Sequence, residues 1–268
     1  MYPFNFERVG DIAEAETLLS GDEECILIAG GMTLLPTMKQ RLAQPTRLLD
    51  LSSIESLTGI TVSSSAVTIK ALTTHAEVAS DAGIKENLPA LAALAEGIGD
   101  PQVRNRGTLG GSLANADPAA DYPAALLALD ATVVTNHRSI PAEQFFIDMF
   151  ETTLEGNEII TSASFKIPTR AAYVKFPNPA SRYAIVGVFI AQFDSEYRVA
   201  VTGAAGSVFT LPNVEEALTS EASVESLEQA LAASPVDEDE LNDDIHASAA
   251  YRAHLINVMV QRAFKQLN

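Results

Sequence analysis

The chain has 268 residues, which suffices for one large domain or two modest ones that each bury a core. Lys and Arg number 17 against 35 Asp and Glu, and the net charge of −18 would repel phosphate backbones and anionic membranes, so nucleic acid is not an expected partner. No apolar run approaches the roughly 20 residues that cross a bilayer, and the opening MYPFNF lacks the features of a signal peptide, which predicts a cytoplasmic product without a transmembrane segment.

The cysteine and histidine content argues against a metal centre in this chain. Cys25 is the single cysteine, which excludes an internal disulfide and an iron–sulfur cluster held by several thiolates of one chain. The four histidines show no metal-ligand spacing and are expected to have ordinary surface or capping roles: His75, His137, His246 and His254. No metal site is therefore predicted, and any iron–sulfur cluster would belong to another subunit.

The first 50 residues are predicted to form a helix, a strand, a tight turn and a second helix. Asp11 followed by Glu14 is a helix-start pair ahead of an apolar helical face. Residues 26–29 are a short apolar run typical of a buried strand, and the Gly-Gly pair at 30–31 then makes a turn. The helix after it has apolar side chains at helical spacing, from Leu34 to Leu42.

The middle of the chain is predicted to alternate strands and helices around a second Gly-Gly turn at 110–111. The predicted strands are 47–51, 67–72, 131–135 and 159–167, and the predicted helices begin at Pro89 and span 123–129. A stretch punctuated by Pro168, Pro177 and Pro179 is then expected to be the domain boundary.

The C-terminal part is predicted to be a small sheet with helices. Residues 183–193 and 198–205 are expected to pair as antiparallel strands, and helices are expected at 214–218, 224–232 and 245–267. The acidic run 237–244, DEDELNDD, is predicted to be a solvated loop that carries no site.

Two loops have the composition of a diphosphate-binding site. Residues 29–36, AGGMTLLP, offer glycines that let a ligand approach backbone amides, and Thr33 adds a hydroxyl. This loop is neither a GxGxxG nor a Walker A motif, and taken alone a Gly-Gly turn is more often simple punctuation. Residues 106–121 contain more small and hydrogen-bonding residues than the first loop does. Together the two loops could hold one diphosphate from both sides. The alternative is two unrelated loops with helix caps at Asp117 and Asp121.

These two loops also carry a resemblance to a known family. AGGMTLLPTMKQRLAQPTRLLDL (29–51) and DPQVRNRGTLGGSLANADPAADYPAALLALDA (100–131) closely resemble the FAD-binding subunit of molybdenum hydroxylases, the family of xanthine dehydrogenase, and above all the medium subunit of aerobic carbon monoxide dehydrogenases. KFPNPASRYAIVGV (175–188) and YRAHLINVMVQRA (251–263) are similar too, so the likeness covers nearly the whole chain.

The resemblance implies an α+β fold with a PCMH-type FAD-binding region of two α/β subdomains, about 1–58 and 59–172, followed by a sheet-and-helix domain at 173–268. It also implies noncovalent FAD, in agreement with the absence of His and Cys from both loops. Molybdopterin and two [2Fe–2S] clusters are expected only on partner subunits, a large and a small one, in a dimer of heterotrimers. The flavin would accept single electrons and release pairs to quinone, NAD or oxygen.

The resemblance carries over to individual cofactor positions. One side of the pyrophosphate is expected to be wrapped by Ala29, Gly30, Gly31, Met32, Thr33 and Leu34. The other side is expected to meet Gly107, Thr108, Gly110, Gly111 and Ser112. Asn115 and Asp121 are expected to hold hydroxyls of the ribityl or ribose groups. Further contacts along the cofactor are expected from Ile98, Gly99 and Ile160.

Two more positions and one departure belong to this pattern. Lys175 matches a basic residue near the flavin ring, where a positive charge would stabilise the anionic reduced flavin, and Tyr183 matches an aromatic residue over the ring. For each, a structural role is the alternative: a surface lysine on a loop and a core tyrosine. Met32 stands where the family often has a polar residue, so a backbone contact there would survive and a side-chain contact would not.

No catalytic residue is predicted in this chain. The predicted function is electron transfer in a molybdenum hydroxylase, with carbon monoxide dehydrogenase as the first assignment. The alternatives are the FAD subunit of a xanthine or aldehyde dehydrogenase, a stand-alone FAD reductase with its own catalytic acid and serine, and a flavin-binding assembly protein without turnover.

Overall fold

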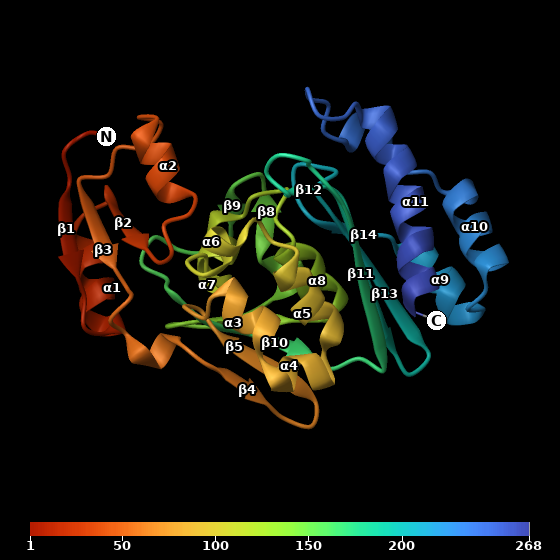
Figure 1. Cartoon of the computed structure of the whole chain (residues 1–268), viewed down its shortest axis with the longest axis horizontal. Helices are drawn as coiled ribbons and strands as arrows, with labels where there is room; N and C mark the ends of the chain where they lie inside the picture. The colour runs from red at the N-terminus through yellow and green to blue at the C-terminus, as the bar shows by residue number, and fades with distance from the viewer. Residues whose placement is uncertain (268) are drawn as a thin grey trace.

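The computed structural model describes residues 1–267, and in it three sheet-containing units follow one another along the long axis (Figure 1). Helices and strands both contribute throughout, which confirms the predicted α+β class. Of the helices in the described range, none is long and apolar enough to cross a membrane.

The N-terminal unit is a three-stranded parallel sheet in the order β1-β3-β2. Its elements are β1 (Asn5–Arg8), α1 (Ile12–Gly21), β2 (Cys25–Ile28), α2 (Leu34–Lys39), β3 (Arg47–Asp50) and the 3-10 turn η1 (Glu55–Leu57). Helix α1 begins where predicted, because the Asp11 side chain accepts a hydrogen bond from the Glu14 amide at 2.8 Å.

Helix α2 is shorter than predicted. It ends at Lys39, and Arg41 then takes a left-handed conformation with φ of 63°. Leu42 was expected on the apolar face of this helix, but it lies beyond the end and is 75% exposed. Apolar spacing alone did not reveal this stop, because neither a glycine nor a proline marks it.

The central unit is a five-stranded antiparallel sheet in the order β4-β5-β10-β6-β7. Its strands are β4 (Ile60–Val62), β5 (Ala66–Lys70), β6 (Thr132–Thr135), β7 (Ser139–Pro141) and β10 (Ile160–Lys166). Its helices are α3 (His75–Ser80), α4 (Ala82–Asn87), α5 (Pro89–Glu96), α6 (Pro101–Arg104), α7 (Leu109–Asn115) and α8 (Tyr122–Ala128). The turn η2 (Ala142–Gln144) leads to a hairpin of β8 (Phe146–Asp148) and β9 (Glu151–Thr152).

The C-terminal unit is a four-stranded antiparallel sheet covered by helices (Figure 1). Its elements are β11 (Arg170–Pro177), β12 (Ala184–Phe193), β13 (Glu196–Thr202), β14 (Phe209–Thr210), α9 (Pro212–Ser220), α10 (Val224–Ala233), η3 (Glu238–Glu240) and α11 (Ala249–Leu267). The predicted pairing of the segments at 183–193 and 198–205 is confirmed as β12 against β13.

This sheet packs on both faces. Helix α11 lies against β11 and β12 on one face, while α5 and α8 of the central unit contact the other face. Phe189, Ala191 and Ala200 are therefore buried in the same apolar cluster as the central helices. The central and C-terminal units share one core at this junction.

Two C-terminal expectations need correction. The predicted helix start at Ile245 is wrong, because α11 begins at Ala249 and Ile245 is 96% exposed. The acidic run is also more than a solvated loop, since Asp244 forms an ion pair of 2.8 Å with buried Arg252. Of the three prolines in the predicted boundary stretch, Pro168 lies just before β11, Pro177 is its last residue and Pro179 lies in the turn after it.

Candidate cofactor site

A cavity of about 550 Å³ lies where the three units meet. Every residue predicted to contact the cofactor lines it, with the exception of Lys175. These lining residues are Ala29, Gly30, Gly31, Met32, Thr33, Leu34, Ile98, Gly99, Gly107, Thr108, Gly110, Gly111, Ser112, Asn115, Asp121, Ile160 and Tyr183.

The first loop runs from the end of β2 into α2. Gly31 has φ of +71°, a conformation that suits glycine, and its carbonyl accepts the Leu35 amide at 3.1 Å to start the helix. A Cβ on Gly30 would lie 2.0 Å from the Arg106 carbonyl oxygen. The backbones of the two predicted loops thus touch at Gly30, which only a residue without a side chain permits.

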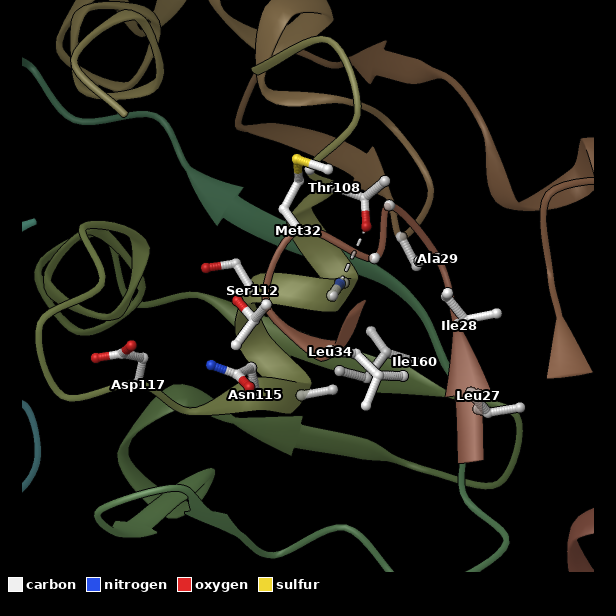
Figure 2. Close-up of a pocket in the computed structure, with 18 of the residues that line it drawn as sticks. Leu27, Ile28, Ala29, Met32, Leu34, Thr108, Ser112, Asn115, Asp117 and Ile160 are labelled. Atoms are coloured by element: carbon white, nitrogen blue, oxygen red, sulfur yellow. Dashed lines mark hydrogen bonds between the residues drawn. The ribbon is translucent and has the colours of Figure 1, made fainter. Parts of the chain in front are cut away.

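The second loop differs from the prediction at its glycine pair. Gly110 and Gly111 do not form a turn, because they lie in the first turn of helix α7. Thr108 caps this helix, and its hydroxyl accepts the Gly111 amide at 3.2 Å (Figure 2). A Cβ on Gly111 would lie 3.8 Å from the Cβ of Ala29. The start of α7 therefore faces the first loop across the cavity.

The cavity has a polar wall and an apolar wall. Ser112, Asn115 and Asp117 lie together on one side of the view, and Leu27 and Ile160 lie on the other (Figure 2). Met32 also lines the cavity and is 37% exposed. A ligand that fits such a cavity carries both hydrogen-bonding groups and an apolar ring.

The alternative prediction was that the side chains of Asp117 and Asp121 cap helices. It is wrong for both residues. Asp117 accepts the Ala119 amide at 2.9 Å in a turn that precedes α8, and burial raises the pKa of its carboxyl. Asp121 precedes α8 directly but makes no side-chain cap bond to it. Asp121 instead pairs with Lys175 and accepts the Tyr173 hydroxyl, as described below.

The C-terminal unit contributes one edge of the cavity through the loop before β12. Ser181, Arg182 and Tyr183 line the cavity from this loop. The Tyr183 side chain is partly desolvated there, which raises the pKa of its hydroxyl, and Asp117 raises it further, while a hydrogen bond with Thr33 opposes both effects. Arg182 donates to the Gly99 carbonyl at 3.3 Å, which ties this loop to the central unit.

The segment at Ile98 and Gly99 is fixed by a neighbouring arginine. The Arg104 guanidinium donates to the carbonyl oxygens of both residues, at 3.0 and 3.1 Å. Gly99 has φ of +48° and packs against Val103. A turn that the sequence pattern did not reveal thus places both residues in the cavity wall.

Lys175 lies outside the cavity. Its ammonium is 2.8 Å from Asp121 Oδ1 and 2.9 Å from the Gly97 carbonyl oxygen, and its side chain is 10% exposed. The surface-lysine alternative is thus wrong, and the charge lies behind the cavity wall.

His75 and Cys25 also line the cavity, although neither was predicted to do so. The expected surface or capping role of His75 is wrong, because it is buried with its amide bonded to the Gly107 carbonyl at 3.0 Å. Burial lowers the pKa of His75 to about 4, with Arg104 adding to the effect, so the ring is neutral. The capping box of Thr74 and Glu77 was the available signal, since it places the start of α3 against the second loop.

No group of three or more candidate metal-ligand side chains occurs within residues 1–267. Cys25 is buried, and burial raises the pKa of its thiol, so the thiol stays protonated.

Comparison with known proteins defines the class. Residues 2–170 match the family pattern described as the FAD binding domain in molybdopterin dehydrogenase, and residues 171–267 match the CO dehydrogenase flavoprotein C-terminal domain. The chain belongs to this family of FAD-binding dehydrogenase subunits.

Individual relatives match over nearly the full length. The chain is 38% identical to the nicotine 6-hydroxylase medium subunit of Paenarthrobacter nicotinovorans, over 94% of this chain and 92% of that protein. It is 33% identical to the carbon monoxide dehydrogenase medium chain of Hydrogenophaga pseudoflava, over 97% and 95%. The carbon monoxide dehydrogenase structure from the same organism superposes with a TM-score of 0.92 at 32% identity, covering 100% of this chain and 98% of that one.

The residues present fit the family cofactor, FAD. The cavity volume falls within the roughly 300–1,000 Å³ that is usual for small-molecule and cofactor sites. Gly30 and Gly111 leave the facing loops without side chains, so a diphosphate can approach their amides closely. The polar and apolar walls suit the hydroxyl-bearing chain and the ring of a flavin (Figure 2). The chain is thus an FAD-containing subunit of a multi-subunit oxidoreductase.

Proposed function

We propose that this chain is the electron exit of a cytoplasmic molybdenum hydroxylase. In this proposal the chain holds noncovalent FAD, whose ability to accept single electrons and release pairs would let it receive electrons from the [2Fe–2S] clusters of a small subunit and pass them to quinone, NAD or oxygen. The large subunit, which carries molybdopterin, would supply those electrons. The observation that carries this proposal is one cavity, lined by two glycine-containing loops, in a chain whose single thiol is buried and protonated. Assembly as a dimer of heterotrimers is part of the proposal.

Within the cavity we assign the first loop and the start of α7 to the two sides of the pyrophosphate. Asn115 and Asp121 then face the hydroxyls of the cofactor, and Tyr183 covers the flavin ring. The FAD-binding domain would span 1–172 and the C-terminal domain 173–268. The shared core at Phe189 means that these domains support one another even if each has its own sheet.

The substrate of the holoenzyme is a separate question, because in this proposal the substrate contacts lie on the large subunit and not on this chain. Carbon monoxide is the first candidate, supported by the TM-score of 0.92. Nicotine-type N-heterocycles are the second candidate, supported by the 38% identity to the nicotine hydroxylase subunit. Both candidates should be tested with the large subunit present.

The experiment is anaerobic absorbance at the flavin band, with each candidate substrate added to the isolated chain and to the reconstituted complex. We expect no bleaching of the isolated chain and rapid bleaching in the complex. Bleaching of the lone chain at the rate of the complex would make it a self-sufficient reductase. A complex that turns over equally well with a flavin-free variant of this chain would instead support the assembly-protein alternative.

A further inference from the structure

A buried trio of side chains connects the C-terminal sheet to the wall of the FAD cavity. Lys175 and Tyr173 both project from β11, and both contact the same oxygen, Oδ1, of Asp121. Asp121 is 4% exposed and lines the cavity. Neither donor takes the second carboxylate oxygen, Oδ2.

The same lysine holds a second part of the wall. Its ammonium donates to the Gly97 carbonyl at 2.9 Å, and Gly97 ends helix α5 immediately before the lining residues Ile98 and Gly99. One charged group on the C-terminal sheet therefore fixes two segments of the central unit that face the cofactor.

The neighbouring strand is shaped around Tyr173. A Cβ at Gly187 on β12 would lie 2.5 Å from the Tyr173 hydroxyl oxygen, so glycine at this position leaves room for the hydroxyl that reaches Asp121. The ring of Tyr173 packs against Phe189 with centroids 5.9 Å apart. These contacts hold the tyrosine in one orientation.

From this geometry we propose that Lys175 and Tyr173 are positioning residues for FAD, which act through Asp121 and do not touch the cofactor. Together they are called the Asp121 clamp. The inference rests on the proposed function, in which Asp121 accepts a cofactor hydroxyl. It assigns the C-terminal domain a direct part in shaping the FAD site.

The clamp also opposes protonation of Asp121. Burial raises the pKa of this carboxyl, and the Lys175 charge, with hydrogen bonds from Lys175 and Tyr173, opposes the rise. The other titratable groups nearby are neutral tyrosines and one acid: Tyr122, Tyr183 and Asp117. Lys175 is thus the one cation paired with Asp121 among residues 1–267, and its removal should let the carboxyl take up a proton.

A double-mutant cycle tests this route, with the FAD dissociation constant of the full chain measured by flavin fluorescence. We expect Lys175→Met and Asp121→Asn each to weaken FAD binding about tenfold, as for loss of a charge-assisted hydrogen bond. The double variant should bind no more weakly than Asp121→Asn alone. Multiplied effects in the double variant would show that Lys175 acts on the cofactor independently of Asp121, and would overturn the clamp.

The pH profile gives a second readout, which a merely structural role would not move. In Lys175→Met, affinity should fall more steeply than in the unmodified protein as pH drops from about 8 to 5, because loss of the Lys175 charge favours protonated Asp121, which no longer accepts the cofactor hydroxyl. A flat profile for the variant would contradict the role of Lys175 in ionising Asp121.

Two further variants keep the test decisive if Lys175→Met folds poorly. Tyr173→Phe removes only a hydroxyl, and it should weaken FAD binding about threefold in the natural chain but not beside Asp121→Asn. Lys166→Met breaks a surface pair with Asp130 and should leave FAD binding unchanged. Failure of the unmodified chain to bind FAD would sink the proposed function itself, whereas normal binding with independent effects would sink only the clamp.

Discussion

Gly30 is the residue at which the two FAD loops touch. A Cβ there would lie 2.0 Å from the carbonyl oxygen of Arg106, which belongs to the backbone and cannot rotate away. Gly30→Ala should therefore push the loops apart and weaken FAD binding at least about 100-fold, as expected when a diphosphate loses several backbone amides.

The measurement is FAD content after gel filtration, together with the FAD dissociation constant. Gly21→Ala is the matched control, because nothing lies within 4 Å of the added methyl group at the end of α1. Gly30→Ala with normal FAD content would show that the contact between the loops is not needed for the cofactor.

Glu158, which lines the cavity, contributes to the stability of the fold in a way that depends on pH. Its carboxylate accepts two bonds from Arg138, both at 2.8 Å, and further bonds from Thr135 and the Glu155 amide. The Arg138 bonds are the main reason that the pKa of Glu158 is lowered from 4.5 to about 2.

This shift predicts a pH dependence of folding. Because the folded-state pKa lies below the unfolded value, Glu158 stabilises the fold above about pH 4.5, and that stabilisation is lost as pH falls towards 2. Glu158→Gln should reduce the free energy of unfolding at pH 7 by on the order of 2 kcal/mol and flatten its decline between pH 5 and 3. Urea unfolding at several pH values measures this, with Glu228→Gln at an exposed position as control. Parallel curves for Glu158→Gln and the natural protein would refute the role of Glu158.

Residue types predicted which two loops line the cavity, while side-chain partners escaped prediction. Glycine and small polar residues at 29–34 and 107–112 line the cavity because their backbone is what a diphosphate requires. Lys175 and His75 were misjudged because burial of each depends on contacts with residues far away in the sequence: Asp121 and Gly97 for the lysine, Tyr122 and Gly107 for the histidine.

At the scale of elements, helix α11 is anchored by one buried arginine. Arg252 donates to the carbonyl oxygens of Ile185 on β12 and Gly203 just after β13, at 2.7 and 2.8 Å, and pairs with Asp244. It is 3% exposed, so these carbonyl oxygens would lack donors without it.

Arg252→Met should therefore lower the free energy of unfolding by roughly 2–4 kcal/mol, through unsatisfied buried carbonyl groups. At about 2–4 °C per kcal/mol for a chain of this size, Tm should fall by about 4–16 °C. Differential scanning calorimetry measures the change. Arg262→Met, an exposed position on the same helix, is the control, and an equal small effect of both would contradict the anchoring role.

The glycine pair at 110–111 was predicted incorrectly for a physical reason. Gly110 and Gly111 resemble a turn in sequence, yet the Thr108 cap and contact of Gly110 with Ala71 hold them in a helix. Tertiary contacts overrode local preference there, beside the cavity.

At the scale of the whole molecule, three sheets meet around one cavity and two of them share a core. The first loop comes from the parallel sheet, α7 from the central unit, and Tyr183 from the C-terminal unit. A cofactor bound there contacts all three units at once. FAD is therefore expected to stabilise the chain as a whole and not a single domain.

The last prediction follows from that arrangement. A ligand that binds only the folded state at 100 times its dissociation constant adds about 2.7 kcal/mol to stability. At about 2–4 °C per kcal/mol, saturating FAD should raise Tm of the flavin-free chain by about 5–10 °C, as one transition, because Phe189 and Ala200 tie the C-terminal sheet to the central core. Calorimetry with FAD and with FMN measures this. FMN lacks the adenosine and the second phosphate, so its shift should be smaller. An equal shift with FMN, or a second transition that FAD leaves unmoved, would show that the cofactor does not bridge the three units.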